Sequence, residues 1–194
     1  MTKIYIATGI DNSNPIPTPW AYNSLLDADG DITGVVKADL IDDTNTSTGY
    51  EFESVERLSQ ASTLTLSNNT TAFPDETLLQ SWNGNNGATG SYKINNLPAG
   101  SSYEIVIIGW NNNFRNTIYT VDGVSQTYNP GSTSNIGTPV TFAGVVGVTG
   151  SISIEAVSTS GSGIAYLSGL TLDIIPSSVQ VTATTDPLST GSSS

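Results

Sequence analysis

The side chains best suited to binding chemistry lie in the segment GWNNNFRN, residues 109–116. A tryptophan indole can stack on the apolar face of a sugar ring, while asparagine amides and an arginine guanidinium can bond the hydroxyls of that ring. The sequence therefore predicts a glycan-binding surface built from this segment and one further tyrosine. The predicted residues are Trp110, Asn111, Asn112, Asn113, Arg115 and Tyr128.

A purely structural interpretation of the aromatic residues stays open. Trp110 can complete the core at the end of a central strand, and an Asn-rich segment is ordinary turn chemistry. Trp20, which follows the proline-rich NPIPTP, and Trp82 can line a ligand groove or seal the ends of a sandwich. Tyr128 and Tyr166 carry the same two interpretations.

Acidic residues are the material from which a hydrolase could be made. A glycosidase of the usual kind needs two carboxyl groups that face each other about 5–10 Å apart. Glu51 and Glu53 share one face of a predicted strand, but nothing in the sequence places another acid across a cleft from them. The chain has no histidine and no cysteine. We therefore predict a protein that is not an enzyme and holds no cofactor. The acids considered are Asp42, Asp43, Glu51, Glu53, Asp75 and Glu76.

The segment DADGDITG, residues 27–34, resembles the start of a calcium loop. A helix-flanked loop of that kind has ligands at positions 1, 3 and 5, glycine at 6 and glutamate at 12. Asp27, Asp29 and Asp31 fill the first three, but Ile32 and Ala38 occupy positions 6 and 12. The spacing predicts a turn between strands and no metal site, with an irregular calcium site as the alternative.

Composition excludes several classes of partner. Five Lys and Arg against 17 Asp and Glu give a net charge of −12, which repels nucleic acid and anionic membrane surfaces. No apolar stretch is long enough to span a bilayer, so we predict no membrane insertion. The N-terminus lacks the apolar core of a signal peptide, and we expect synthesis in the cytoplasm.

Hydrophobic alternation with period two recurs along the chain and predicts about ten strands. Segments such as LPAGSS, VDGVS and TSGSG separate these strands and supply turn residues. The pattern predicts an all-β fold, an antiparallel β-sandwich with jelly-roll topology, over residues 1–175. One short helical turn is expected in FPDETLLQSW, residues 73–82, and residues 176–194 read as an extended polar tail.

Several landmarks occur in a familiar order: IYIATG, PTPWAYNSL, LDADGDITGV, AFPDETLLQSW, YKINNLPAGSSYEIVIIG, RNTIYTVDG and GIAYLSGLTL. Through them, residues 1 to about 175 resemble the galactose-binding-like, carbohydrate-binding-module type of jelly-roll domain. The resemblance implies a sandwich that binds sugars or serves as a spacer. Fold alone does not decide between these roles.

A single such domain, with a terminal tail and a surface on which most polar residues are uncharged, also suggests a biological setting. We expect a structural and adhesive protein of a phage virion, either a head decoration or a tail appendage. It would contact other virion subunits, associate with itself and offer a glycan-binding surface. The alternative is a free-standing bacterial carbohydrate-binding module of a surface or secreted system, located outside the cell.

Overall fold

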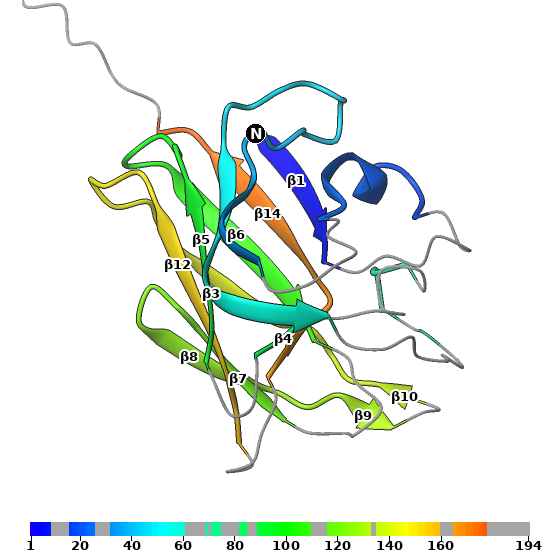
Figure 1. Ribbon diagram of the computed structural model, residues 1–194. Coiled ribbons are helices and arrows are strands. Elements are labelled where there is room, and N and C mark those ends of the chain that lie inside the picture. Colours follow the sequence, from blue (N-terminus) through cyan, green and yellow to red (C-terminus); the bar gives the residue numbers. More distant parts are fainter. Residues whose placement is uncertain are drawn as a thin grey trace, which may run out of the picture.

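The computed structural model describes residues 1–8, 16–25, 32–60, 69, 71–74, 82–84, 89–109, 116–132, 135–159 and 165–177. Over these residues the chain forms two main antiparallel β-sheets that pack face to face, and one short 3-10 helix (Figure 1). None of the helical residues described forms a helix long and apolar enough to cross a membrane.

The first sheet has four strands among the described residues, and their order is β1-β14-β6-β11. Their bounds are β1 (Thr2–Ala7), β14 (Gly169–Ile175), β6 (Ser102–Ile108) and β11 (Val140–Val145). The first strand of the chain thus pairs with the last described strand, in the register Tyr5↔Thr171. We call this the four-stranded sheet.

The second sheet has eight strands in the same described ranges, in the order β13-β4-β3-β5-β12-β7-β8, with β2 paired to β3. Their bounds are β2 (Ile32–Lys37), β3 (Glu51–Gln60), β4 (Trp82–Gly84), β5 (Gly90–Asn95), β7 (Thr117–Val121), β8 (Val124–Tyr128), β12 (Ile152–Ser158) and β13 (Tyr166–Leu167). A small separate ladder joins β9 (Gly131–Ser132) to β10 (Asn135–Ile136). The chain crosses repeatedly between the two main sheets, which confirms the predicted jelly-roll sandwich.

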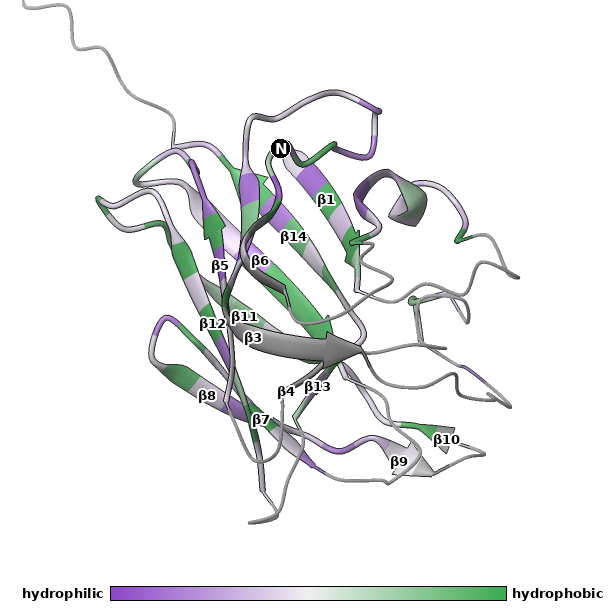
Figure 2. Ribbon diagram, in the orientation of Figure 1, coloured by the Kyte–Doolittle hydropathy of each residue, from purple (hydrophilic) through white to green (hydrophobic). Residues whose placement is uncertain are grey.

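The core lies between the two sheets and follows from the alternation in the sequence. In β6, Tyr103, Ile105 and Ile107 are buried, whereas Ser102 before them and Glu104 between the first two are exposed. β12 alternates in the same way, and Figure 2 shows the resulting stripes of apolar and polar residues along the strands. β6 has a hydrogen-bonded neighbour on each side, so it is a central strand of its sheet.

The turn predicted in VDGVS is a hairpin turn at Asp122 and Gly123. Val121 pairs with Val124, and the two turn residues have φ angles of 45° and 84°. Positive φ at both central positions is what a tight two-residue hairpin turn requires, and Asp-Gly tolerates it well. The turn connects β7 to β8 at one end of the eight-stranded sheet.

One predicted strand is divided in the structure. GIAYLSGLTLDII reads as a single strand, but Ser168 interrupts it between β13 and β14, which belong to different sheets. The Ser168 backbone is bonded beside the ends of β6 and β1, in the four-stranded sheet. Its N–H donates to Ile108 O at 2.9 Å, and its carbonyl accepts from Thr8 N at 3.1 Å. Unbroken alternation could not reveal this crossing, because both short strands bury the residues beside it.

The helix lies at a position that the sequence did not predict. It is η1 (Trp20–Asn23), directly after the prolines. Of the predicted helical turn at 73–82, residues 75–81 lie outside the described residues, and Trp82 begins β4. The turn predicted at Asp27, Asp29 and Asp31 and the tail from residue 178 onward also lie outside them, so both stay predictions.

Candidate functional site

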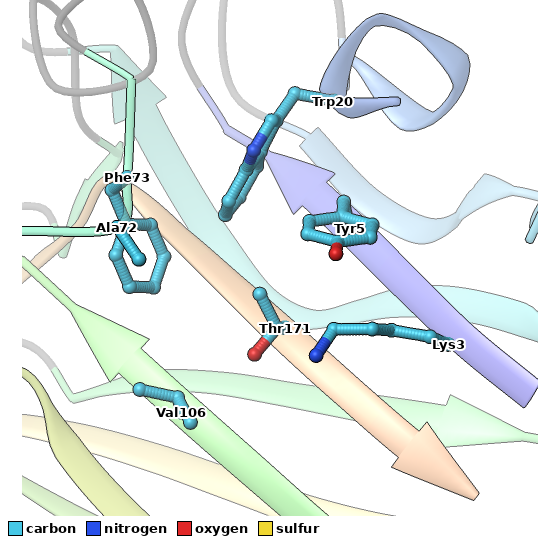
Figure 3. A pocket seen from close by; sticks show the side chains of 7 residues that line it. All are labelled: Lys3, Tyr5, Trp20, Ala72, Phe73, Val106 and Thr171. Carbon is cyan, nitrogen blue, oxygen red and sulfur yellow. The ribbon is translucent and has the colours of Figure 1, made fainter. Parts of the chain in front are cut away.

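A pocket with a volume of about 240 Å³ opens on the outer face of the four-stranded sheet, away from the core (Figure 3). It combines residues from both ends of the described chain with residues from its middle. The described residues that line it are Lys3, Tyr5, Trp20, Ala72, Phe73, Val106 and Thr171.

The floor of the pocket is one cross-strand row of the sheet. Tyr5 on β1 is in register with Thr171 on β14, which is in register with Val106 on β6. The neighbours of Tyr5 along β1, Ile4 and Ile6, are fully buried in the core, so the row projects from the opposite face. The floor therefore offers an aromatic ring, a hydroxyl and an aliphatic group on a hydrogen-bonded scaffold.

Aromatic rings form one wall. The Trp20 ring lies 5.0 Å from the Tyr5 ring in an edge-to-face arrangement and 4.9 Å from the Phe73 ring, centroid to centroid. These separations are within the range of favourable aromatic pairs. Trp20 and Phe73 are only 4% and 3% exposed, so their rings are fixed by packing. Trp20 thus belongs to the buried cluster and also lines this pocket.

Asn23 holds the helix that carries Trp20. Its side chain is fully buried, and its Nδ2 donates to Tyr5 O at 3.0 Å and to Ile41 O at 2.7 Å. Its Oδ1 accepts from Ile41 N at 2.7 Å. The adjacent Leu25 N donates to Ala7 O at 2.8 Å. Asn23 therefore joins η1, the outer edge of β1 and the segment near residue 41 at one point.

A second asparagine shapes the segment that carries Phe73. Asn69 Oδ1 accepts from Thr71 N at 2.8 Å and from Thr71 Oγ1 at 2.7 Å, and its Nδ2 donates to Phe73 O. This local turn, in which an amide replaces backbone hydrogen bonds, fixes the approach of Phe73 to the pocket.

The other side of the pocket is charged. Lys3 Nζ lies 3.2 Å from Asp173 Oδ2 and 5.6 Å from the centre of the Tyr5 ring. Burial opposes the charge on Lys3, but the hydrogen bond and the charge of Asp173 outweigh that effect and raise the pKa of the Lys3 ammonium. Asp173 is in register with Lys3 on one side and with Glu104 on the other. Its Oδ1 is buried and has no hydrogen-bond partner among the described residues.

The lining residues offer several groups that can contact a ligand. The described lining residues include no carboxylate, histidine or cysteine that could act as a nucleophile or a general base. They do place three aromatic rings, a hydroxyl and an ammonium group around one pocket. A ligand with an apolar face and a polar edge matches that combination.

Of the carboxylates considered for catalysis, the structure describes Asp42, Asp43, Glu51 and Glu53, whereas Asp75 and Glu76 lie outside the described residues. Glu51 and Glu53 on β3 are in register with Asn95 and Lys93 on β5, and Glu53 Oε2 accepts from Asn95 Nδ2 at 2.9 Å. Asp42 Oδ1 is bonded to Thr44 and Thr46 within its own turn. Within the described ranges, no three His, Cys, Asp or Glu side chains gather in a way that could hold a metal ion.

The predicted glycan-binding segment is separate from this pocket in the sequence. Trp110, Asn111, Asn112, Asn113 and Arg115 lie outside the described residues, so their role stays a prediction. Tyr128 is described, and it is fully buried with its ring 6.4 Å from that of Tyr119. Burial raises the pKa of its hydroxyl. In this structure the ring offers no exposed stacking surface, so a glycan role for Tyr128 stays a prediction that requires its exposure.

No protein-family model matches the sequence, and no curated protein matches it. Two structures of β-glucuronidase 2 from Bacteroides uniformis, one a calcium-binding mutant and one covalently bound to cyclophellitol-6-carboxylate aziridine, share the fold. Each has a TM-score of 0.54 and 14% identity. The match covers 90% of this chain and 18% of the glucuronidase, so this chain spans about a fifth of that protein's length.

A CBM35 from Cellvibrio japonicus Abf62 is a weaker structural match. Its TM-score is 0.37 at 19% identity, over 56% of this chain and 80% of that chain. At 14% identity the glucuronidase matches show a shared fold alone, over a small part of a longer protein.

Proposed function

We propose that this chain is a non-enzymatic glycan-binding domain and that the aromatic pocket on the four-stranded sheet is its binding site. The observation that carries the proposal is that three aromatic rings and two polar side chains line the same pocket. The rings are those of Tyr5, Trp20 and Phe73, and the polar side chains are Lys3 and Thr171. Sugars have apolar C–H faces and hydroxyl edges, and this pocket presents an aromatic wall beside polar groups.

The size of the pocket indicates how much of a glycan it would hold. Its volume of about 240 Å³ is below the roughly 300–1,000 Å³ of sites that enclose drug-sized ligands. One sugar ring, such as the terminal residue of a chain, suits that space better than several rings. The rest of the glycan would extend into solvent.

Binding by wild type and two tyrosine variants on a glycan array, followed by titration calorimetry, tests this site. Tyr5→Ala removes the aromatic floor and should abolish binding. Tyr22→Ala is the matched control, because Tyr22 is a half-buried tyrosine of η1 that is not among the residues lining the pocket. Binding that survives Tyr5→Ala unchanged would exclude the pocket as the site.

The segment at residues 110–115 is a second candidate surface for the same function. Trp110→Ala separates it from the pocket in the same assays. If Trp110→Ala abolishes binding and Tyr5→Ala leaves it intact, the glycan site belongs to that segment.

For the biological setting we propose an adhesive protein on a phage particle, with a free-standing bacterial carbohydrate-binding module as the alternative. Exposed apolar side chains support a contact surface for assembly: Val145 and Ile175 are 62% and 53% exposed, and both are in register with Ser102 at one end of the four-stranded sheet. Mass spectrometry of purified virions tests this setting. A chain that never copurifies with particles would favour the bacterial module.

A further inference from the structure

We infer that the pocket selects uncharged sugar rings and disfavours sugars that carry a carboxylate. This inference rests on the proposed function and names the ligand class of the same site. Lys3 is the one cationic side chain among the described lining residues, and it is already paired with Asp173. The inference follows from that ion pair.

Acidic groups outnumber Lys3 in its surroundings. Asp173 is its ion-pair partner, and Glu104 follows Asp173 in the same cross-strand row. Asp43 is a third neighbour, because its backbone N–H donates to Lys3 O at 2.9 Å and its charge acts on the Lys3 ammonium. Two carboxylates act on one ammonium and a third follows in the same row, so this side of the pocket is net negative, in a chain whose total charge is −12. An anionic ligand therefore meets repulsion as it enters.

Asp173 also depends on Lys3. Its side chain is only 12% exposed, its Oδ2 is paired with Lys3 Nζ, and its Oδ1 has no hydrogen-bond partner among the described residues. A ligand carboxylate that drew Lys3 away would leave a largely buried charge without compensation. Leaving such a group unpaired is strongly unfavourable. The ion pair thus keeps Lys3 from serving as an anchor for anions.

A neutral sugar has no such conflict. The Lys3 ammonium has three donor hydrogens, so it can donate to a ligand hydroxyl while remaining bonded to Asp173. The Thr171 hydroxyl, which also lines the pocket, can donate to or accept from a second hydroxyl. The ring face can meanwhile lie against Tyr5 and Trp20.

Titration calorimetry with matched ligand pairs tests the inference. The probes are the methyl glycosides of glucose, galactose and mannose and of the corresponding uronic acids, which differ only at C6. Wild type should bind its preferred neutral glycoside at least about tenfold more tightly than the matching uronate. This ratio of the two affinities should shrink at high salt, because Lys3 and the carboxylates near it are partly exposed to solvent and salt screens their charges.

Two variants with the same change in net charge test whether the Lys3–Asp173 ion pair causes the preference for neutral glycosides. Asp173→Asn releases Lys3 and should shift the ratio toward the uronate. Glu155→Gln removes one negative charge from an exposed position on β12 of the other sheet and should leave the ratio unchanged. An equal effect of both variants would overturn the assignment to the ion pair. Should Asp173→Asn fail to fold, the salt dependence of the wild-type ratio still tests the inference.

The remaining outcomes separate the inference from the proposed function. If wild type binds uronates as tightly as neutral glycosides, or more tightly, and Tyr5→Ala abolishes that binding, the inference is wrong while the glycan site stands. If no glycoside of the panel binds and the array is also blank, both are wrong.

Discussion

Replacement of Asn23 by alanine should destabilise the protein more than any single surface change. The side chain is fully buried and makes three hydrogen bonds to backbone groups of Tyr5 and Ile41, at 3.0, 2.7 and 2.7 Å. Each intramolecular hydrogen bond contributes about 1 kcal/mol net, and a buried group left without a partner costs about 1–3 kcal/mol. We therefore expect the free energy of unfolding to fall by about 3 kcal/mol. The loss is larger if water cannot enter to bond the backbone groups that the amide leaves without a partner.

The measurement is urea denaturation followed by tryptophan fluorescence, with Asn95→Ala as the matched control. Asn95 makes one side-chain hydrogen bond, to Glu53 at 2.9 Å, in a half-buried position. Its loss should lower the free energy of unfolding by about 0.5–1 kcal/mol. Asn23→Asp tests the two donated bonds separately from the accepted one. Its carboxylate still accepts from Ile41 N, but it has no proton to donate to the carbonyl oxygens of Tyr5 and Ile41. It should destabilise at least as strongly as Asn23→Ala.

The result that would refute this reasoning is a loss for Asn23→Ala no greater than that for Asn95→Ala. Water would then be replacing the amide, and the helix that carries Trp20 would be held by packing alone. The same variant should also weaken any ligand bound in the pocket, because Asn23 is three residues from Trp20 in η1.

Three further predictions concern the sandwich itself. Asp122→Ala should lower the free energy of unfolding by about 2 kcal/mol in urea, because the carboxylate accepts a 2.9 Å bond from Tyr103 of the other sheet and closes a turn at positive φ. Gly144→Ala should cost about 1–3 kcal/mol in the same assay, since a Cβ there would lie 2.6 Å from Tyr103 Oη. Asp42→Asn should reduce the fall in melting temperature on acidification below about pH 4, because hydrogen bonds from Thr44 and Thr46 hold the pKa of Asp42 below 3.8.

Each of these has a control or a contrary outcome. Asp122→Asn tolerates the positive φ and should lose less than Asp122→Ala. Gly147→Ala has open space around its added Cβ and should be neutral, so equal losses at the two glycines would contradict a steric cause. A lowered pKa in the folded state gives stability that is present above the unfolded pKa and lost as the pH falls through the folded pKa. Equal acid sensitivity of Asp42→Asn and wild type would therefore contradict a role for this turn.

The sandwich could be predicted from the sequence because its signals are local. Alternation along β6 and β12 and the Asp-Gly pair of the β7–β8 hairpin each act over a few residues, and each was matched by the structure. The passage at Ser168 was missed because alternation does not say which sheet a strand joins.

The pocket could not be predicted because its residues are distant in sequence. Its floor joins Tyr5, Val106 and Thr171 through strand register, which no local pattern encodes. Trp20 was recognised as a candidate, but the helix that orients it follows three prolines and depends on the buried amide of Asn23. Only a tertiary contact with β1 distinguishes that asparagine from the many others in the chain.

The pairing of β1 with β14 has a consequence for when the pocket comes into existence. Tyr5 leaves the ribosome long before Thr171, yet the two residues are neighbours in one ladder. Closing so long a loop is a late and slow event in folding. A chain still being synthesised can assemble the β7–β8 hairpin but has no complete pocket floor. Ligand binding at this site would therefore report that the whole domain has finished folding.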